Sequence, residues 1–194
     1  MFEGLNSLIH SGWFPWYWDP CGGIDPSLIT DGNTYLGDNV PDNKEIRNSI
    51  SFHHTPLHRD SDQSLDTPYR SVKSIISASD EKFGIEVSKI IRCRMNLTCP
   101  VPNFGPDNYN VPHVDWPDLE NYFTLLYYLD DSDGDTFIFN EHYKDGFPKT
   151  VTIDRRISPK SNMALLMDGW KYHASSNPVK SNQRITINFN VELK

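Results

Sequence analysis

The chain has 194 residues, of which 37% are hydrophobic and 12% aromatic. A chain of this size can bury a full core and lies near the upper end of the usual single-domain range, so we expect one domain. Asp and Glu outnumber Lys and Arg by 26 to 18, and no basic block interrupts the acidic balance of −8. Because phosphate backbones are bound by clustered cations, this composition argues against nucleic acid as the main partner.

The sequence also argues against a membrane protein. Its apolar runs are shorter than the roughly 20 residues of a membrane helix. The segment "MFEGLNSLIHSGWFPWYWDP" has no basic n-region and no small-residue cleavage site. Cys93 and Cys99, if they share one strand, are about 20 Å apart at roughly 3.3 Å per residue and cannot bridge. Reduced thiols fit a cytosolic setting, so we expect a cytoplasmic protein.

Helices are expected in the N-terminal part of the chain, at residues 2–10 and 67–83. In the second segment Thr67 can cap the helix and Pro68 suits its first position. The 14 prolines and 11 glycines make the chain rich in loops and argue against a helical bundle. The apolar positions with helical spacing in the second segment are Val72, Ile75, Ile76 and Phe83.

From about residue 85 the pattern changes to short strands separated by turn sequences such as "DDSDGD" and "KDGFPK". Many short strands with regular turns indicate an antiparallel sandwich or barrel. We therefore predict a mainly β fold with a double-stranded β-helix, or jelly-roll, core over residues 88–194. Residues 1–87 would form a helical and loop support, with the helices packed on one face. The predicted strands are residues 88–99, 121–130, 135–141, 149–154, 162–169, 171–176 and 184–193.

Two of these strands have informative faces. In "RITINFNVE" the residues alternate strictly, with an apolar face and a face formed by Arg184, Thr186, Asn188 and Asn190. On alternation alone, a half-exposed strand with a wet polar face and a strand with a buried polar face are about equally supported. In "YFTLLYYLD" both faces are largely apolar, which predicts a strand covered on both sides.

A candidate metal site begins with "NVPHVDWPD". His113 and Asp115 stand two positions apart, and residues two apart in extended backbone point to the same side. Pro112 and Pro117 stiffen the loop on either side. Two imidazoles and one carboxylate on one face of an open coordination sphere are typical of non-haem Fe(II) sites. The H-x-D pair would provide two of these ligands, and the third must come from a distant strand.

His173 lies 58 residues after Asp115 on a predicted strand, and Arg184 follows 11 residues later. A planar guanidinium opposite such a site can hold a dicarboxylate co-substrate through two parallel hydrogen bonds. Each element alone is a weak signal, but together they form a sharper pattern. The competing cluster "HHTPLH" contains His53, His54 and His58 without a carboxylate at matching spacing. We interpret it as a loop or strand near the site entrance.

Together these residues resemble the 2-oxoglutarate- and Fe(II)-dependent oxygenases, in particular the prolyl-4-hydroxylase-like branch, over roughly residues 88–193. The motif "HVD" is similar to the family's ligand pair, and "SPKSNMALLMDGWKYHAS" is similar to the segment that carries the distal histidine. The resemblance implies that His113, Asp115 and His173 hold the iron. It also implies a single oxygenase domain over residues 1–194.

The same resemblance implies a set of residues that bind the co-substrate. "QRITINF" is similar to the closing strand of the family, in which Arg184 would hold the far carboxylate of 2-oxoglutarate and Thr186 would assist. "YYLDDSDGDTFIF" is similar to a strand and turn in which the hydroxyl of Tyr128 would assist. "RCRMNLT", with Asn96 pointing inward, resembles the corresponding strand of stand-alone members often carried by marine phages. A phage-encoded member would act in the host cytoplasm.

The activity that the resemblance implies is hydroxylation of a C–H bond, with 2-oxoglutarate and O2 consumed and succinate and CO2 formed. Fe(II) is the implied cofactor, and ascorbate is a candidate auxiliary reductant. The substrate is open between a prolyl or other peptidyl side chain and a small molecule, and the expected assembly is a monomer or weak homodimer. The aromatic stretch "WFPWYWDP" either packs the N-terminal segment onto the sandwich or lines an entrance.

Two other classes of function are compatible with parts of this pattern. A non-catalytic jelly-roll binding module of cupin or lectin type would use the histidines and Asp115 only as structural groups. A Zn(II) hydrolase would use the same three ligands to activate water, but it would give Arg184 and Tyr128 no task.

Overall fold

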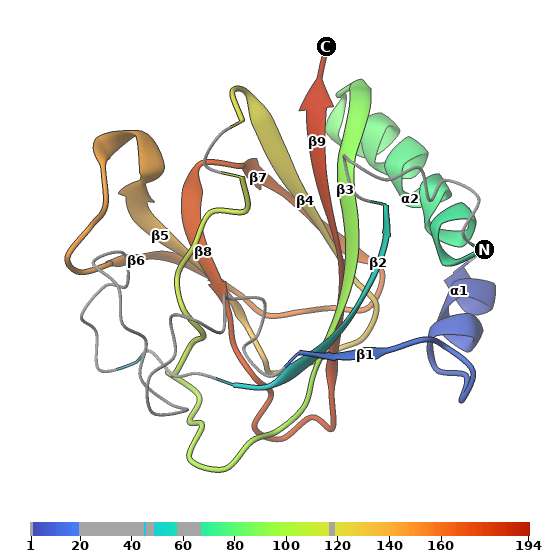
Figure 1. The fold of residues 1–194 in the computed structure, drawn as a ribbon, viewed down its shortest axis with the longest axis horizontal. Coiled ribbons are helices and arrows are strands. Elements are labelled where there is room, and N and C mark those ends of the chain that lie inside the picture. Colours follow the sequence, from blue (N-terminus) through green and yellow to red (C-terminus); the bar gives the residue numbers. More distant parts are fainter. Residues whose placement is uncertain (1, 20–44, 46–48, 58–66, 117–118) are drawn as a thin grey trace.

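The structure, a computed structural model, describes residues 2–19, 45, 49–57, 67–116 and 119–194. Two helices, α1 (Phe2–Ile9) and α2 (Thr67–Phe83), lie side by side at one edge of the molecule (Figure 1). Their bounds agree with the predicted segments to within one residue. The side chains of Thr67 and Pro68, and therefore the predicted cap, are outside the described part. Neither helix of the described chain combines the length and apolar character that crossing a bilayer requires.

The strands form two antiparallel sheets. The larger sheet has six strands in the order β1-β2-β3-β9-β4-β7, and the smaller one has three in the order β6-β5-β8. A short 3-10 helix, η2 (Tyr143–Asp145), follows β5. The strands of the larger sheet are β1 (Tyr17–Asp19), β2 (Ser51–Leu57), β3 (Val87–Thr98), β4 (Tyr122–Tyr128), β7 (Met163–Asp168) and β9 (Arg184–Leu193). Those of the smaller sheet are β5 (Thr136–His142), β6 (Ile153–Ile157) and β8 (Lys171–Ser175).

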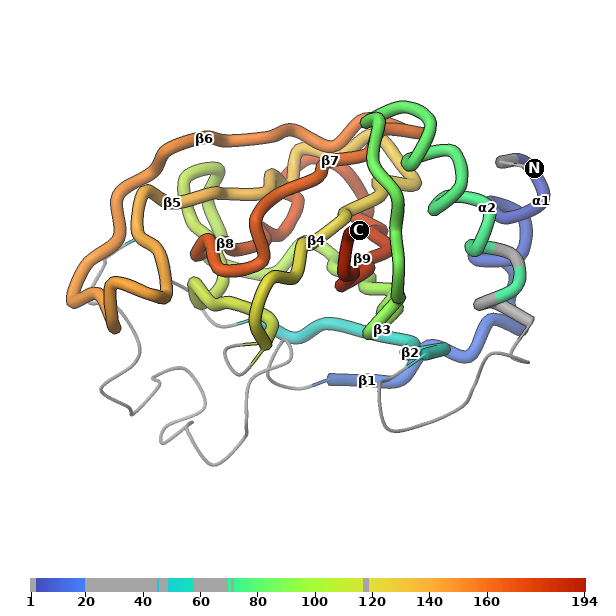
Figure 2. The backbone as a smooth tube through the Cα atoms, turned by 90° about the horizontal axis from the view of Figure 1, so that it is seen from above, coloured from blue at the N-terminus to red at the C-terminus, as the bar shows by residue number. Residues whose placement is uncertain are grey.

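The order of the strands is that of a jelly roll. Strands β3, β9, β4 and β7 form one wall, and β6, β5 and β8 form the facing wall (Figure 2). An isolated antiparallel bridge between His113 and His173 extends the second wall by the segment that precedes β4. That segment takes the place of the eighth strand in the eight-stranded jelly roll. The predicted fold class, a mainly β jelly-roll core, is confirmed.

Most of the predicted strands are confirmed in position. Six of the seven agree with the structure to within two residues at each end. The seventh, predicted at residues 149–154, is wrong because β6 covers Ile153–Ile157. The backbone N–H of Thr152 is satisfied by the Glu141 carboxylate at 2.9 Å, and the pairing of β6 with β5 shifts its register between Ile138 and Phe139. An exposed edge strand of this kind has no apolar alternation by which its bounds could be predicted.

Strands β1 and β2 were not predicted as such. Strand β1 has three residues within the aromatic stretch, and β2 contains Pro56 and a register irregularity between His54 and Leu57. A strand this short, or one that contains a proline and a register irregularity, has no regular alternation from which it could be predicted. The open interpretation of "HHTPLH" as loop or strand resolves to a strand for His53 and His54, whereas His58 lies outside the described residues.

The helices cover the outer face of the larger sheet, as predicted. One core cluster joins them to the sheet, and its central members include Ile76 of α2, Leu125 of β4 and Phe189 of β9. A smaller apolar cluster, including Leu126 and Tyr128, lies between the two walls of the jelly roll. Strand β4 is therefore covered on both sides, which confirms the prediction from its sequence.

Strand β9 separates these two environments. Its apolar residues face the helices, and its polar residues, from Arg184 to Asn190, face the interior of the jelly roll. Every residue from Arg184 to Val191 is buried. The alternative of a half-exposed strand with a wet polar face is therefore wrong. A polar face buried inside a β-barrel needs partners, and it is there that the candidate site lies.

Candidate metal centre and its cavity

The structure brings the three predicted metal ligands together. His113 and His173 are held opposite each other because each backbone N–H donates to the other residue's carbonyl at 3.0 Å. Asp115 follows two residues after His113, so its side chain points to the same side. One ligand atom from each of the three residues lies within 4.8 Å of the others. Among the described residues, this is the one group of three or more His, Cys, Asp or Glu side chains that could hold a metal ion.

Backbone carbonyls fix the orientation of both imidazoles. The Nδ1 atom of His113 lies 2.9 Å from the carbonyl of Val111, and that of His173 lies 3.1 Å from the carbonyl of Lys171. A proton on each Nδ1 leaves Nε2 as the free acceptor, which is the arrangement of a metal-binding histidine. Burial, followed by the neighbouring His113, lowers the pKa of His173 to about 4. The imidazole of His173 is therefore neutral at pH 7, as ligation requires.

The carboxylate of Asp115 is held from several directions. Its side chain is 6% exposed, and Oδ1 accepts a hydrogen bond from Nη2 of Arg92 at 2.5 Å. Oδ2 accepts hydrogen bonds from Nδ2 of Asn190 at 2.8 Å and Nδ2 of Asn188 at 3.2 Å. Burial by itself would raise the pKa of Asp115, but Arg92, the two histidines and Asn190 outweigh it and hold the pKa well below its usual range. The carboxylate is therefore ionised, and these hydrogen bonds fix its orientation.

A tyrosine anchors the loop that carries Asp115. The hydroxyl of Tyr122 accepts a hydrogen bond from the backbone N–H of Trp116 at 3.0 Å and donates to the carbonyl of Gly169 at 2.6 Å. A Cβ at position 169 would lie 2.3 Å from the Tyr122 ring, so only glycine lets the two segments approach this closely. Of the two prolines predicted to stiffen this loop, Pro112 lies within the described residues and Pro117 lies outside them.

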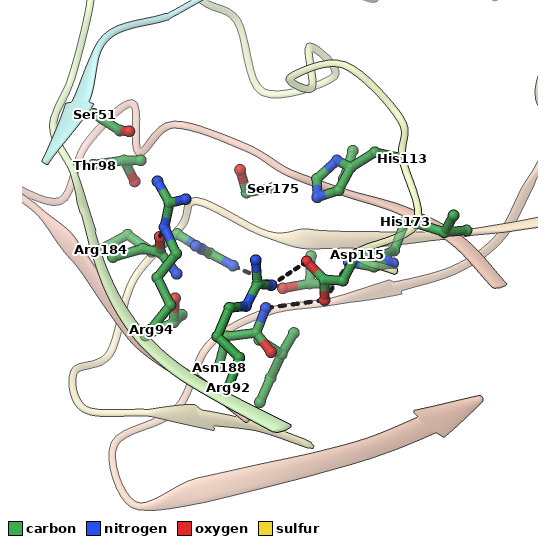
Figure 3. Close-up of a pocket in the computed structure, with 16 residues that line it drawn as sticks. Ser51, Arg92, Arg94, Thr98, His113, Asp115, His173, Ser175, Arg184 and Asn188 are labelled. Atoms are coloured by element: carbon green, nitrogen blue, oxygen red, sulfur yellow. Dashed lines mark hydrogen bonds and ion pairs between the residues drawn. The ribbon is translucent and has the colours of Figure 1, made fainter. Parts of the chain in front are cut away.

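The triad opens into a cavity of about 240 Å³ inside the jelly roll (Figure 3). Its walls come from β2, β3, β4, β5, β8, β9 and the segment that carries His113 and Asp115. The predicted co-substrate residues Asn96, Arg184 and Thr186 line it together with the triad. The remaining lining residues are Ser51, Arg92, Arg94, Thr98, Val114, Leu126, Thr136, Ala174, Ser175 and Asn188.

Arg184 is a buried cation that forms no ion pair with a carboxylate in the described part of the chain, although the buried Asp135 lies near enough to raise its pKa. It is 3% exposed, its Nε donates to the carbonyl of Gly134 at 2.8 Å, and its Nη2 donates to Oγ1 of Thr136 at 2.9 Å. Among the described residues, no carboxylate lies within ion-pair distance of it. Burial, the larger effect, lowers its pKa overall. A Cβ at position 134 would lie 2.8 Å from the carbonyl oxygen of Ser176 and 3.0 Å from Cδ of Arg184. Glycine is therefore required where the turn packs against these two residues.

Tyr128 lies one layer behind the cavity wall. It is fully buried, and its hydroxyl donates to Oγ1 of Thr136 at 2.8 Å, the same atom that receives Arg184. Tyr128 is not among the residues that line the cavity. Its ring lies under the guanidinium, with Cζ of Arg184 5.9 Å from the ring centroid, and the two side chains also share Thr136. A direct role of Tyr128 in holding a co-substrate remains a prediction.

Two site residues escaped the sequence reasoning. Arg92 and Arg94 both line the cavity, and Arg92 binds the candidate ligand Asp115 directly. The signal was present in "RCRMNLT", where Arg92, Arg94 and Asn96 alternate with buried Cys93 and Met95, as the polar face of β9 does. The pairing of Arg92 with Asp115 depends on strand register, which the pattern alone does not give.

The residues present fit Fe(II) and a dicarboxylate. Two imidazoles and an ionised carboxylate on one side of a cavity are the donor set of a non-haem Fe(II) site. The buried guanidinium of Arg184, in the same cavity, offers a charge-assisted site for a carboxylate. His53 and His54 belong to no metal-binding group among the described residues.

Comparisons with known proteins show likenesses of fold. No protein-family model and no curated protein matches the sequence. The solved structure of AviO1 from Streptomyces viridochromogenes is similar at a TM-score of 0.50 and 13% identity over 81% of this chain and 74% of that one. A 2OG-Fe(II) oxygenase family oxidoreductase from Burkholderia pseudomallei is similar at a TM-score of 0.48 and 14% identity over 79% and 70%. The alpha-ketoglutarate-dependent epimerase SnoN of nogalamycin biosynthesis gives 0.49 and 11% over 98% and 81%.

Proposed function

We propose that this chain is an Fe(II)- and 2-oxoglutarate-dependent oxygenase that hydroxylates a C–H bond of a small-molecule or peptidyl substrate. The observation that carries the proposal is that one cavity holds both a candidate metal-binding triad and a buried guanidinium. A compact His113, Asp115 and His173 triad stands on one side, and a buried Arg184 without a carboxylate partner among the described residues stands on another. Residues 1–194 would form a single domain of the prolyl-4-hydroxylase-like branch.

Each residue of the site has a task in this proposal. His113, Asp115 and His173 would hold the iron, and Arg184 would pair with the far carboxylate of 2-oxoglutarate. Asn96 and Thr186, which line the same cavity, would donate further hydrogen bonds to the co-substrate. When bound, iron and 2-oxoglutarate would supply, with O2 as the oxidant, the oxidative decarboxylation in which one oxygen atom enters succinate with release of CO2 and the other hydroxylates the substrate.

The protein's own groups prepare the site before any ligand arrives. The backbone carbonyls of Val111 and Lys171 keep both imidazoles turned toward the metal position. Arg92 and the asparagines of β9 keep Asp115 ionised and prevent it from rotating. Such prearranged groups raise reactivity because little reorganisation is needed when the reactants bind.

The two other classes account for less of the site. A cupin-like binding module and a Zn(II) hydrolase could both use the triad. Neither gives Arg184 an anion, although a buried, unpaired cation is costly to retain. The oxygenase proposal is favoured because 2-oxoglutarate supplies both the metal-binding group and the carboxylate that Arg184 lacks.

Ligand-dependent thermal stability tests the proposal. With Mn(II) in the site, 2-oxoglutarate at about 100 times its Kd should stabilise the fold by about 2.7 kcal/mol. For a chain of this size that is a rise in Tm of about 5 to 10 °C. The rise should require the metal and should be absent with glutarate, which lacks the keto group. An equal rise without metal, or none at all, would contradict the proposal.

A further inference from the structure

The cavity carries more positive charge than the proposed reaction uses. Three of its lining residues are arginines, Arg92, Arg94 and Arg184, against a single carboxylate, Asp115. They come from the neighbouring strands β3 and β9, whose polar residues share the face of the sheet that lines the cavity. This concentration of cations is local, since the whole chain has a net charge of −8. A divalent metal and the dianion of 2-oxoglutarate would cancel each other and leave the excess unchanged.

Two of the three arginines have their tasks assigned. Arg92 is committed to Asp115 through the 2.5 Å hydrogen bond. Arg184 is committed to the co-substrate in the proposed function. Arg94 is the third, and Figure 3 shows it reaching from β3 toward Ser51 and Thr98, away from Asp115.

In the described part of the chain, the partners of Arg94 occupy only two of its three guanidinium nitrogens. Its Nε donates to Oδ1 of Asn96 at 2.9 Å, and its Nη2 donates to Oδ2 of Asp19 at 2.9 Å. Among the described residues, Nη1 makes no hydrogen bond. Asp19 also lies 3.6 Å from Nδ1 of His53. Burial, followed by repulsion from Arg92, lowers the pKa of Arg94, as expected in a positive field.

A buried hydroxyl beside Arg94, that of Thr98, also has no hydrogen-bond partner among the residues that the structure describes. Thr98 lines the cavity and is 4% exposed, and its Oγ1 makes no hydrogen bond among the described residues. Buried polar atoms are almost always paired, so an unpaired one in a cavity wall points to a missing ligand group. A carboxylate beside Arg94 could accept from both this hydroxyl and the free Nη1.

We propose that Arg94, with Thr98 and Ser51, forms a subsite for a carboxylate of the substrate, so that the enzyme acts on an anionic substrate. The inference rests on the proposed function, because it assigns the co-substrate to Arg184. The planar fork of arginine suits a carboxylate, and pairing within the cavity neutralises the charge that the metal and 2-oxoglutarate leave over. The substrate is thereby oriented by one end, with its other end directed to the metal.

Acetate and acetamide are matched probes of this subsite, since they differ in charge and little in size. In protein loaded with Mn(II) and 2-oxoglutarate, which does not turn over, the paramagnetic ion broadens the proton NMR signal of a probe that binds nearby. We expect stronger broadening of acetate than of acetamide. Arg94→Gln should weaken acetate binding by about tenfold or more, because it removes a charged hydrogen-bonding partner. Arg155→Gln, on the exposed strand β6, is the control and should change nothing.

Asp19, whose carboxylate accepts a hydrogen bond from Arg94, provides a second variant that leaves Arg94 in place. Asp19→Asn removes the competing anion and should strengthen acetate binding, opposite in sign to Arg94→Gln. If Arg94 and Asp19 only tie β1 to β3, neither variant will alter the difference between acetate and acetamide, and the subsite is refuted. Equal broadening of the two probes in the wild-type protein would refute it as well.

The affinity for 2-oxoglutarate separates this inference from the proposed function. Arg94→Gln should leave the Kd of 2-oxoglutarate within about twofold of wild type, whereas Arg184→Gln should raise it by about 10- to 100-fold. If both variants weaken 2-oxoglutarate alike, Arg94 binds the co-substrate and the substrate subsite is refuted while the oxygenase proposal stands. If 2-oxoglutarate does not bind the metal-loaded protein at all, the proposed function itself fails.

Discussion

The two faces of strand β9 are equally buried and chemically opposite. Toward the helices, Ile187 and Phe189 pack with the outer core. Toward the interior, Arg184 and Asn188 line the cavity with the metal triad. The same ten-residue strand therefore builds a closed apolar core on one side and a polar chamber on the other.

The difference separates what stabilises the fold from what prepares the site. Burial of apolar side chains is favourable by about 25 cal/mol per Å². Burial of a guanidinium or an amide is unfavourable unless each group is paired. Burying Asn188 and Arg184 costs free energy of desolvation, and apolar residues at these positions would stabilise the fold without that cost. Substitutions on the two faces should consequently affect different measurements.

The largest effect is expected on the polar side, at the proposed metal ligand Asp115. Asp115→Ala removes the one carboxylate of the triad and leaves Nη2 of Arg92 without its carboxylate partner. Metal affinity should fall by more than the roughly 10- to 100-fold that follows when only a group supporting a ligand is changed. Metal content after dialysis measures it, together with succinate formation. Wild-type turnover in this variant would show that the site is elsewhere. Asp168→Ala, at an exposed carboxylate, is the matched control.

On the apolar face, the expected effect is on stability. Phe189→Ala deletes a fully buried ring and should lower the free energy of unfolding by about 3 to 5 kcal/mol. Urea denaturation measures this change. The neighbouring Asn188→Ala, on the other face, should cost less stability and weaken metal binding instead, because Asn188 donates to Asp115. Equal losses of stability in the two variants would erase the distinction between the faces.

Arg184→Gln should separate function from stability most clearly. We expect a rise of about 10- to 100-fold in the Kd of 2-oxoglutarate, since an unpaired buried carboxylate costs about 1 to 3 kcal/mol. The ligand-free protein should lose little stability, because the variant also removes a buried cation with no carboxylate partner among the described residues. Titration calorimetry and urea denaturation give the two quantities. A large loss of stability with unchanged co-substrate affinity would assign Arg184 to the fold.

The smallest effect is expected outside both faces. Trp18, on β1, has 63% of its surface exposed, so Trp18→Ala should change the free energy of unfolding by no more than about 0.5 kcal/mol. Phe14, in the same aromatic stretch, is 6% exposed, and Phe14→Ala should cost several times more. A comparable loss in both variants, measured by thermal unfolding, would mean that Trp18 is packed in solution.

Alternation made the interior of the fold predictable. In "RITINFNVE" it identified both faces of β9, and the spacing of His113, Asp115 and His173 identified the triad. Alternation could not decide whether the polar face is wet, since that depends on the opposite wall of the jelly roll. The same limit hid Arg92, whose role follows from its register with Asn190 and its approach to Asp115.

Edges were predicted less well than the interior. Strands β1 and β6 lie at the edges of their sheets, and a strand with one neighbour and an exposed surface needs no regular pattern. Strand β2 contains a proline and an irregular register, which tertiary pairing with β3 overrides. The aromatic stretch was predicted as either packing or entrance, and it divides between a buried Phe14 and exposed Trp13 and Trp18.

The most direct test of the account is the visible spectrum of the protein with Fe(II) and 2-oxoglutarate in the absence of oxygen. Chelation of the keto acid to iron held by His113, Asp115 and His173 predicts a weak metal-to-ligand charge-transfer band. The band should require both ligands, disappear in Asp115→Ala, and need higher 2-oxoglutarate concentrations in Arg184→Gln. No band at full occupancy of both ligands would contradict the oxygenase account.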